Sequence, residues 1–373
     1  MSFFSWLAAA IGKRQSANGS GLPKPKAGSR KSLRFRPQLE ALENRMLPST
    51  YYAATASDLI ADINAANAAG GANTIVLTAP TSSPYVLTAV NNTTDGATGL
   101  PVISGGSKKK VAADNLTIIG NGDTIGRTTA SGTPRFRLFD VASGASLTLE
   151  NVTLQNGFAF GLGVWADGGG IYNQGTLVLS QVTIQNNDAF GYTSSGAGGG
   201  IWSNGSLTLE NSTILANVAN TLGWDYLAFG GGIYIAGGTA NITGSTFGST
   251  FNSYLGNSAQ GSLAYGGAVY VAAGTVTLSG DTLDYNAAEG SGNQLGDDGY
   301  GGALYVAGGS VTLRNVIVQY NAVYNPSNGY YPDYNGGGIF IASGATVYLD
   351  SFTYQNTNNN VSDNIEGGYI LLS

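Results

Sequence analysis

One short motif recurs six times along this chain and constrains the fold more than any other feature. Each copy has glycines followed by an aliphatic residue and an aromatic one, and the aliphatic positions are Ile171, Ile201, Ile233, Val269, Leu304 and Ile339. They are spaced 30, 32, 36, 35 and 35 residues apart. Similarity at a nearly fixed period is typical of stacked repeats. We therefore expect each unit to wind once around a common axis, with these six side chains in one column.

Each unit contains three short segments with strand character. The first follows the glycines, the second alternates apolar and polar residues as in Leu207-Thr208-Leu209, and the third follows a two-residue break as in Thr213-Ile214. Period-two alternation places one set of side chains inward and the other outward. Strands of three to five residues are too short to stand alone, so they must pair with the same strand of neighbouring units.

These features predict an all-β fold, a single-stranded right-handed parallel β-helix in which each coil is a triangle of three short strands. Glycine at the start of each unit suits a sharp corner, where positive φ or close backbone approach is needed. A β-propeller is the alternative fold. Propeller blades need longer antiparallel strands, and Asn-Gly or Asp-Gly hairpin signals do not recur in phase here.

A column of asparagines is expected beside the strands. In each of four units an Asn follows the last Leu of the alternating segment by eight residues, and a fifth fits the pattern after an insertion; the set is Asn187, Asn217, Asn257, Asn286 and Asn321. Asn tolerates the left-handed conformation, and stacked amides can hydrogen-bond from coil to coil. We interpret this set as a structural ladder and not as catalytic residues.

The segment before the repeats has a different pattern. Ser57 and Asp58 begin an amphipathic stretch that ends at Gly70-Gly71, which predicts a helix of roughly three turns with Ser57 as its N-cap. Such a helix would cover the apolar edge of the first coil. The expected organisation is a basic leader over 1–49, the capping helix and first coils over 50–140, and β-helix repeats over 141–373.

Composition excludes several functions. The chain has no Cys and no His, which rules out disulfides, thiolate chemistry, a Ser-His-Asp triad and a His-ligated zinc site. Residues 1–48 carry nine of the 16 Lys and Arg and two of the 22 acids, so the rest of the chain has a net charge of −13. Nucleic acid is therefore not expected as a partner, because phosphate binding needs a basic face. We predict no cofactor and no metal site.

Catalytic residues are not assigned. Hydrolysis of a polysaccharide needs paired carboxylates, and the best pair, Asp297-Asp298, lies in a glycine-rich segment where a polar turn is the simpler interpretation. Asp281 and Asp284 fall on a predicted strand, where exposure at the strand end is expected and calcium binding is the lesser alternative. The early apolar run from Phe3 to Ile11 is too short to span a membrane.

Two resemblances bear on function. Residues 34–49 resemble the LEPR-XLL-type leader of planctomycete surface proteins, through Leu42, Glu43, Arg45 and Leu47, although Asn44 departs from that pattern. The glycine corners and segments such as Ile184-Gln185-Asn186-Asn187 resemble the repeats of polymorphic outer-membrane proteins over about residues 165–360. The first implies export, and the second implies a surface adhesin of the β-helix class that also contains pectate-lyase-like enzymes.

Aromatic residues gather between each Asn and the next glycine corner, and we expect them in loops along one edge of the solenoid. The proposed ligand-binding residues among them are Trp224, Tyr226, Tyr324, Tyr330, Tyr331 and Tyr334. Aromatic loops on a rigid scaffold suit recognition of a glycan or a cell-surface protein. They could instead pack together over one sheet. The function expected is thus non-enzymatic adhesion or glycan binding by an exported protein; the alternative is a polysaccharide lyase or hydrolase acting on an acidic polysaccharide.

Overall fold

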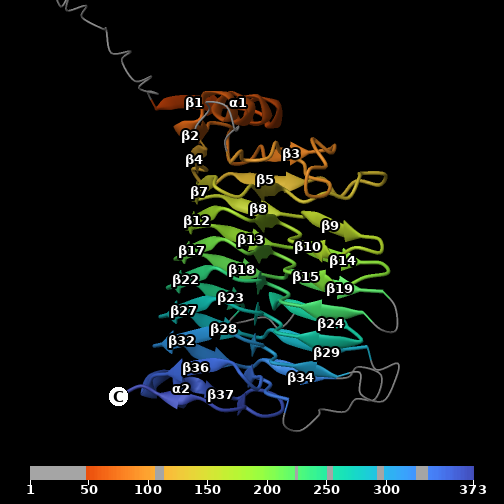
Figure 1. Ribbon diagram of the computed structural model, residues 1–373. Helices are drawn as coiled ribbons and strands as arrows, with labels where there is room; N and C mark the ends of the chain where they lie inside the picture. Colours follow the sequence, from red (N-terminus) through yellow and green to blue (C-terminus); the bar gives the residue numbers. More distant parts are fainter. Residues whose placement is uncertain (1–47, 106–112, 223–225, 250–254, 292–297, 325–334) are drawn as a thin grey trace, which may run out of the picture. The chain divides into compact units, whose positions relative to one another are not determined.

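The computed structural model describes residues 48–105, 113–222, 226–249, 255–291, 298–324 and 335–373. The described chain is a parallel β-helix in which successive coils stack on one another (Figure 1). All pairings between its named strands are parallel, which excludes the propeller alternative for this part of the chain. Within these ranges, no helix has the length and apolar character that crossing a membrane would require.

Three sheets form the body of the solenoid. Sheet A, in spatial order, contains β1 (Ser49–Ala53), β2 (Gly71–Leu77), β4 (Asp114–Ile119), β7 (Ser146–Glu150), β12 (Thr176–Ser180), β17 (Ser206–Glu210), β22 (Thr239–Thr243), β27 (Thr275–Ser279), β32 (Ser310–Arg314), β36 (Thr346–Leu349) and β39 (Ile370–Leu371). Sheet B contains β3 (Tyr85–Leu87), β5 (Thr124–Arg127), β8 (Thr153–Gln155), β13 (Thr183–Gln185), β18 (Thr213–Leu215), β23 (Thr246–Gly248), β28 (Thr282–Asp284), β33 (Ile317–Gln319) and β37 (Thr357–Asn358). Sheet C contains β6 (Phe139–Val141), β11 (Ile171–Asn173), β16 (Ile201–Ser203), β21 (Ile233–Ile235), β26 (Val269–Val271), β31 (Leu304–Val306), β35 (Ile339–Ile341) and β38 (Ile365–Glu366).

The core lies where the repeat predicts it. The six aliphatic residues that follow the glycine corners pair in register along sheet C, from Ile171 to Ile339, and each is fully buried. On sheet A, Leu207 and Leu209 are buried while Thr208 between them is partly exposed. Period-two alternation therefore sorts the side chains as expected, and the buried aliphatic columns form one continuous core along the stack.

Five coils differ from the predicted triangle by two additional strands, and a sixth has one such strand within the described residues. The segments expected as loops between each Asn and the next glycine corner form two further sheets, which we call the arm. Sheet D contains β9 (Phe158–Gly161), β14 (Asp188–Gly191), β19 (Val218–Thr221), β24 (Ser258–Gly261), β29 (Ala287–Gly290) and β34 (Ala322–Tyr324). Sheet E contains β10 (Ala166–Asp167), β15 (Gly196–Ala197), β20 (Leu227–Phe229), β25 (Leu263–Tyr265) and β30 (Gly299–Tyr300).

Small side chains fill the interior of the arm. Ala219, Ala228, Ala259, Ala264 and Ala288 form one fully buried cluster, together with Val323. Alanine methyl groups allow the two sheets to approach closely, because larger side chains would hold them farther apart. The arm is therefore a thin double layer that projects from the three-sided body (Figure 1).

Two helices within the described part of the chain flank the stack. Helix α1 (Ala56–Ala69) buries Leu59, Ile63 and Ala66 and packs on β1 and β2, and α2 (Ser351–Asn356) follows β36. The N-cap of α1 is Thr55, whose Oγ1 accepts a hydrogen bond from the Asp58 backbone N–H at 3.2 Å. The prediction of Ser57 as the N-cap is therefore wrong, because Ser57 lies inside the helix. The role of α1 in covering the first coil stays a prediction.

Candidate functional site

The asparagine column forms a continuous hydrogen-bonded ladder at the junction of body and arm. The Nδ2 atom of each Asn donates to the Oδ1 atom of the next along the series Asn187, Asn217, Asn257, Asn286, Asn321 and Asn360, at distances of 2.9 to 3.0 Å. The same Oδ1 atoms accept backbone N–H groups of the preceding coil, as Asn257 Oδ1 does from Asn217. The first five of these side chains are almost completely buried, and Asn360 is partly exposed. The amide groups of the ladder bond mainly to one another and to the backbone, and two of its members, Asn257 and Asn286, also contribute to the lining of a pocket.

Other predicted residues fall in several places. Trp224, Tyr330, Tyr331, Tyr334 and Asp297 lie outside the described residues. Tyr226 is partly buried just before β20, and its carbonyl accepts hydrogen bonds from Thr221 and Ser262. Tyr324 ends β34 on sheet D. The expectation that Asp281 and Asp284 are exposed is wrong: both are buried, and the Asp281 carboxylate accepts backbone N–H groups of Ser245 and Ser279.

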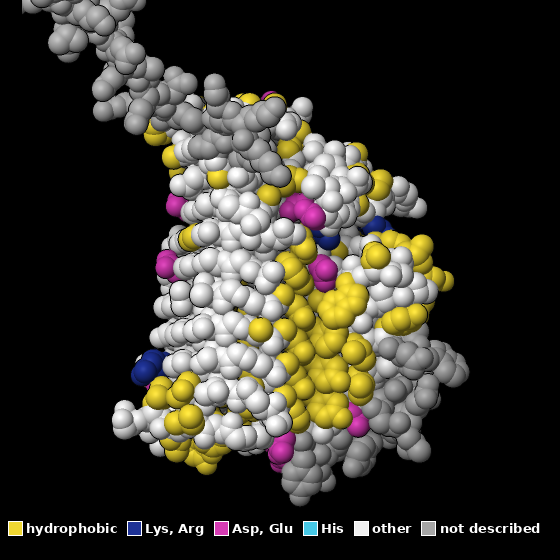
Figure 2. Space-filling view, in the orientation of Figure 1, with side chains coloured by type: hydrophobic (Ala, Val, Ile, Leu, Met, Phe, Trp, Pro, Cys, Tyr) yellow, Lys and Arg dark blue, Asp and Glu magenta, His cyan; other side chains and the backbone are white. Residues whose placement is uncertain are grey.

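Two columns of aromatic rings run along the groove between body and arm. The sheet C column contains Tyr172, Trp202, Tyr234, Tyr270, Tyr305 and Phe340, with successive ring centroids 4.4 to 6.4 Å apart. The column along sheet E contains Trp165, Phe229, Tyr265 and Tyr300, with centroids 5.4 to 5.5 Å apart. We call this surface the aromatic groove. Figure 2 shows it as a band of hydrophobic side chains along the stack.

The rings of the two columns contact one another edge to face. Phe229 meets Tyr270 with centroids 4.9 Å apart at 62°, and Tyr265 meets Tyr305 at 4.9 Å and 71°. Edge-to-face geometry is favourable because the positive ring edge meets the negative face. The aromatic side chains therefore hold the arm against the body. Most of them still remain partly exposed, so the groove has both a packing role and an accessible surface.

Tyrosine hydroxyl groups add polarity to this surface. Burial raises the pKa of Tyr234 and Tyr265 to about 12 and the pKa of Tyr270 further. These phenols therefore keep their protons at neutral pH, and each can donate one hydrogen bond and accept others. Tyr172 accepts a hydrogen bond from Gln174 Nε2 at 3.0 Å. The groove thus offers a row of neutral hydroxyl groups among ring edges.

An aspartate lies at the N-terminal end of each aromatic column. Asp140 pairs in register with Tyr172 on sheet C, and Asp167 occupies the sheet E position that Phe229, Tyr265 and Tyr300 hold in later coils. Asp167 directly precedes its glycine corner, where three other repeats have an aromatic residue. Sequence reasoning missed this site, although an acid at an aromatic position of the repeat was a signal that could have found it.

Arg137 lies beside these two carboxylates. Its guanidinium stacks over the Tyr172 ring at 4.8 Å from the centroid, and Nη1 donates to the Asp95 carbonyl. The Arg137 side chain is almost fully buried, and Nε has no hydrogen-bond partner within the described residues. Gly96 leaves the space that the guanidinium occupies, since a Cβ there would come within 3.2 Å of Nη2. The segment around Asp95 therefore closes this end of the groove over Arg137.

The electrostatics at this end favour proton uptake near neutral pH. Burial raises the pKa of both Asp140 and Asp167 to about 6, although the Arg137 charge works in the opposite direction. Both carboxylate oxygens of Asp140 and one of Asp167 are buried without a hydrogen-bond partner among the described residues. Buried acceptors without a hydrogen-bond partner lower the stability of the folded state, and they are a common feature of functional sites.

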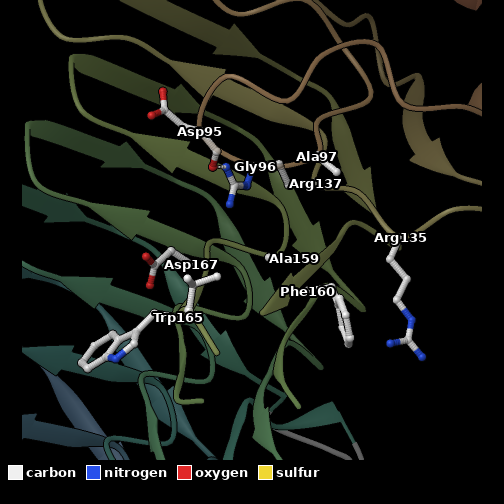
Figure 3. Close-up of a pocket in the computed structure, with 10 residues that line it drawn as sticks. Asp95, Gly96, Ala97, Arg135, Arg137, Ala159, Phe160, Trp165 and Asp167 are labelled. Carbon is white, nitrogen blue, oxygen red and sulfur yellow. Dashed lines mark hydrogen bonds between the residues drawn. The ribbon is translucent and has the colours of Figure 1, made fainter. Parts of the chain in front are cut away.

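A hollow of about 610 Å³ opens at this end of the groove. Its lining includes Asp95, Arg137, Asp167, Trp165 and Phe160. Figure 3 shows Asp95, Arg137, Asp167 and Trp165 on one side of the hollow, with Arg135 and Phe160 on the other. Trp165 is 49% exposed although its ring stacks on Phe229. We call this hollow the groove-end pocket.

The groove-end pocket contains the groups that recognise polar ring-shaped molecules. An indole presents a flat apolar surface, a carboxylate accepts hydrogen bonds and a guanidinium donates them. Among the described residues, no three acidic side chains are grouped as metal ligands would be. No family model matches the chain, and searches of curated proteins and of solved structures found no significant similarity to it.

Proposed function

We propose that this protein binds glycans without cleaving them, with the groove-end pocket as the main contact and the aromatic groove as its continuation. The supporting observation is the half-exposed Trp165 ring, which shares the pocket with the Asp167 carboxylate and the Arg137 guanidinium. The C–H faces of a pyranose ring pack on aromatic surfaces, while its hydroxyl groups pair with charged acceptors and donors. The row of tyrosine hydroxyls then serves successive sugars of a chain.

A glycan array with the full chain tests this proposal. Hits are then measured by calorimetry with Trp165→Ala, Asp167→Asn and, as a matched control, Leu162→Ala. Leu162 is a strongly exposed apolar side chain near Trp165 that is not part of the pocket lining. We expect the first two substitutions to weaken binding by roughly tenfold or more and the control to leave it unchanged. Equal affinity of Trp165→Ala and the unmodified protein would contradict the proposal.

Polysaccharide cleavage is the second candidate, and the raised pKa values of Asp140 and Asp167 favour it. Glycoside hydrolysis uses two carboxyl groups that both reach the sugar. Asp140 has no exposed surface, so Asp95 would have to be the partner of Asp167 in the pocket lining. The exposed Trp165 ring needs no such pair of acids to contact a sugar, and we therefore place binding first. Release of new reducing ends from an array hit, abolished in Asp167→Asn, would reverse this order.

Export to the cell surface forms part of the proposal and depends on the leader resemblance, whose core residues Leu42, Glu43 and Arg45 precede the first strand. A protein that binds extracellular glycans needs export, so the two proposals support each other. Protease treatment of intact cells, followed by mass spectrometry of surface peptides, tests it. Peptides from the coils should be released from intact cells; recovery only after lysis would contradict surface exposure.

A further inference from the structure

A second pocket lies on sheet D and the adjoining corner of sheet B, away from the groove-end pocket. It has a volume of about 550 Å³, and its lining includes Tyr285, Tyr320, Gly256, Gln260 and Glu289. None of these residues belongs to either aromatic column of the groove. We propose that this pocket is a separate binding site for an uncharged or amino-bearing pyranose sugar.

The two tyrosines occupy a backbone position that disfavours them. Each directly precedes a ladder asparagine, and φ is +58° at Tyr285 and +56° at Tyr320. Bulky side chains are rare in this left-handed region, where Asn and Gly are preferred. Three other coils have Asn at the same position, namely Asn156, Asn186 and Asn359. Tyrosine in place of Asn in two adjacent coils therefore costs conformational free energy, and we look for a function of the two rings that explains why this cost is accepted.

The rings form a stacked and accessible platform. Their centroids are 5.1 Å apart with an interplanar angle of 12°, and Tyr320 is 46% exposed. In the two preceding coils the same position is held by Gly256 and Ala216, which both line the pocket. Neither residue carries a ring that would continue the stack. The pocket therefore occupies the space where the tyrosine column stops, as required for a sugar to take the next place in it.

Polar groups face the same space. Glu289 Oε1 accepts a hydrogen bond from Ser258 Oγ at 3.0 Å, and Oε2 accepts one from Gln260 Nε2 at 3.3 Å. Each carboxylate oxygen has a second lone pair, so Glu289 can still accept hydroxyl or amino hydrogens of a ligand. No Lys or Arg is part of the pocket lining, which has Glu289 as its only charged side chain within the described residues. A uronate would be repelled there, whereas a neutral or amino sugar would not.

Saturation-transfer NMR on the full chain tests the site with four probes: glucose, N-acetylglucosamine, glucosamine and glucuronate. Affinities of the probes that bind are then compared in Tyr285→Asn, Tyr320→Asn and Glu289→Gln. Asn is the residue that other coils use at the tyrosine position, so these variants should fold and have an unchanged or higher melting temperature. Tyr52→Asn, an exposed tyrosine on β1, is the control.

We expect at least one neutral or amino probe to bind, glucuronate not to bind, and each tyrosine variant to weaken binding by roughly tenfold or more. Trp165→Ala should leave this binding unchanged, which separates the site from the groove-end pocket. Unchanged binding in both tyrosine variants would overturn the proposal, as would preference for glucuronate. A lower melting temperature in the tyrosine variants, with no probe binding to the unmodified protein, would assign the stacked pair a structural role instead.

Discussion

Asp140 pairs in register with Tyr172 on adjacent strands of sheet C, so the aromatic column of this sheet ends in a buried carboxylate. On sheet E, Asp167 pairs with Ala197 and lies in the same coil as Trp165, the first ring of that column, and Arg137 lies near both carboxylates. Glu366 pairs in register with Phe340 at the opposite end of the sheet C column, so acidic residues flank this column at both ends. The N-terminal end differs by the buried Arg137 near its two carboxylates, and this is where we place the main glycan contact.

The asparagine ladder should contribute strongly to stability. Asn257→Ala removes the hydrogen bonds from Nδ2 to the Ile214 carbonyl and to Asn286 Oδ1, and it leaves the backbone N–H of Asn217 unpaired. Buried groups without partners each cost about 1–3 kcal/mol, so we expect a loss of about 2 kcal/mol or more. Chemical denaturation measures it. Asn241→Ala, on the exposed face of β22, is the control and should change stability little.

The glycine corners should tolerate substitution unequally. A Cβ at Gly231 would meet the backbone carbonyls of Ser258 and Gly267 at 2.3 and 2.5 Å, so Gly231→Ala should disrupt the corner. At the next position, two later repeats have Ala268 and Ala303 in place of Gly232. A Cβ at Gly232 would also meet a backbone carbonyl, that of Ala268, at 2.6 Å, so Gly232→Ala should be destabilising, but less so than Gly231→Ala because the coils with Ala268 and Ala303 accommodate the methyl group. Melting temperatures of the two variants give the comparison, and equal effects would contradict the close-approach argument.

The thin arm should resist larger side chains in its interior. Ala228 is fully buried between sheets D and E, and Ala228→Leu adds volume where neighbouring side chains are also alanines. Overpacking of this kind costs about 1–3 kcal/mol. The same exchange at the exposed Ala273 serves as the control. Limited proteolysis should show earlier cleavage in the arm of Ala228→Leu; identical cleavage patterns would argue against a close-packed arm.

Stability should fall as pH rises through the range of about 4 to 7. Burial raises the pKa of Asp188 to about 7 and those of Asp140 and Asp167 to about 6, from an ordinary value of 3.8. Between these values the folded state holds more protons than the unfolded state, so deprotonation favours unfolding. The urea midpoint should be higher near pH 5 than near pH 7.5. Asp188→Asn should reduce this difference, and an unaltered difference would exclude Asp188 as a contributor.

The sequence predicts the body of the fold well and the arm poorly, for a physical reason. Large aliphatic residues such as Ile171 and Leu207 alternate with polar ones, and period-two burial identifies them directly. In the arm, the inward residues are Ala and Gly, as at Ala189 and Gly196, which carry almost no hydrophobic signal. In the sequence these strands therefore resemble loops, and their aromatic residues, which the sequence predicts along one edge, lie on both sheets of the arm.

The candidate site was missed for a related reason. Arg137 and Asp140 lie before the first glycine-corner motif and Asp167 lies one coil later, so their proximity depends on how the coils stack and not on a repeated motif. The Asn ladder, in contrast, depends on one residue per coil at a constant phase. Its hydrogen bonds follow from the period alone. A residue type that recurs at the same position of every repeat thus predicts a column of side chains. A different residue type at that position predicts where the column ends.

A crystal structure of the protein with a glycan identified on the array tests the central claim most directly. We predict a sugar ring packed on the indole of Trp165, with hydroxyl groups bonded to the Asp167 carboxylate and further sugars directed along the row of Tyr234, Tyr270 and Tyr305. Glycan density elsewhere, with the groove-end pocket filled only by water at saturating ligand, would contradict it.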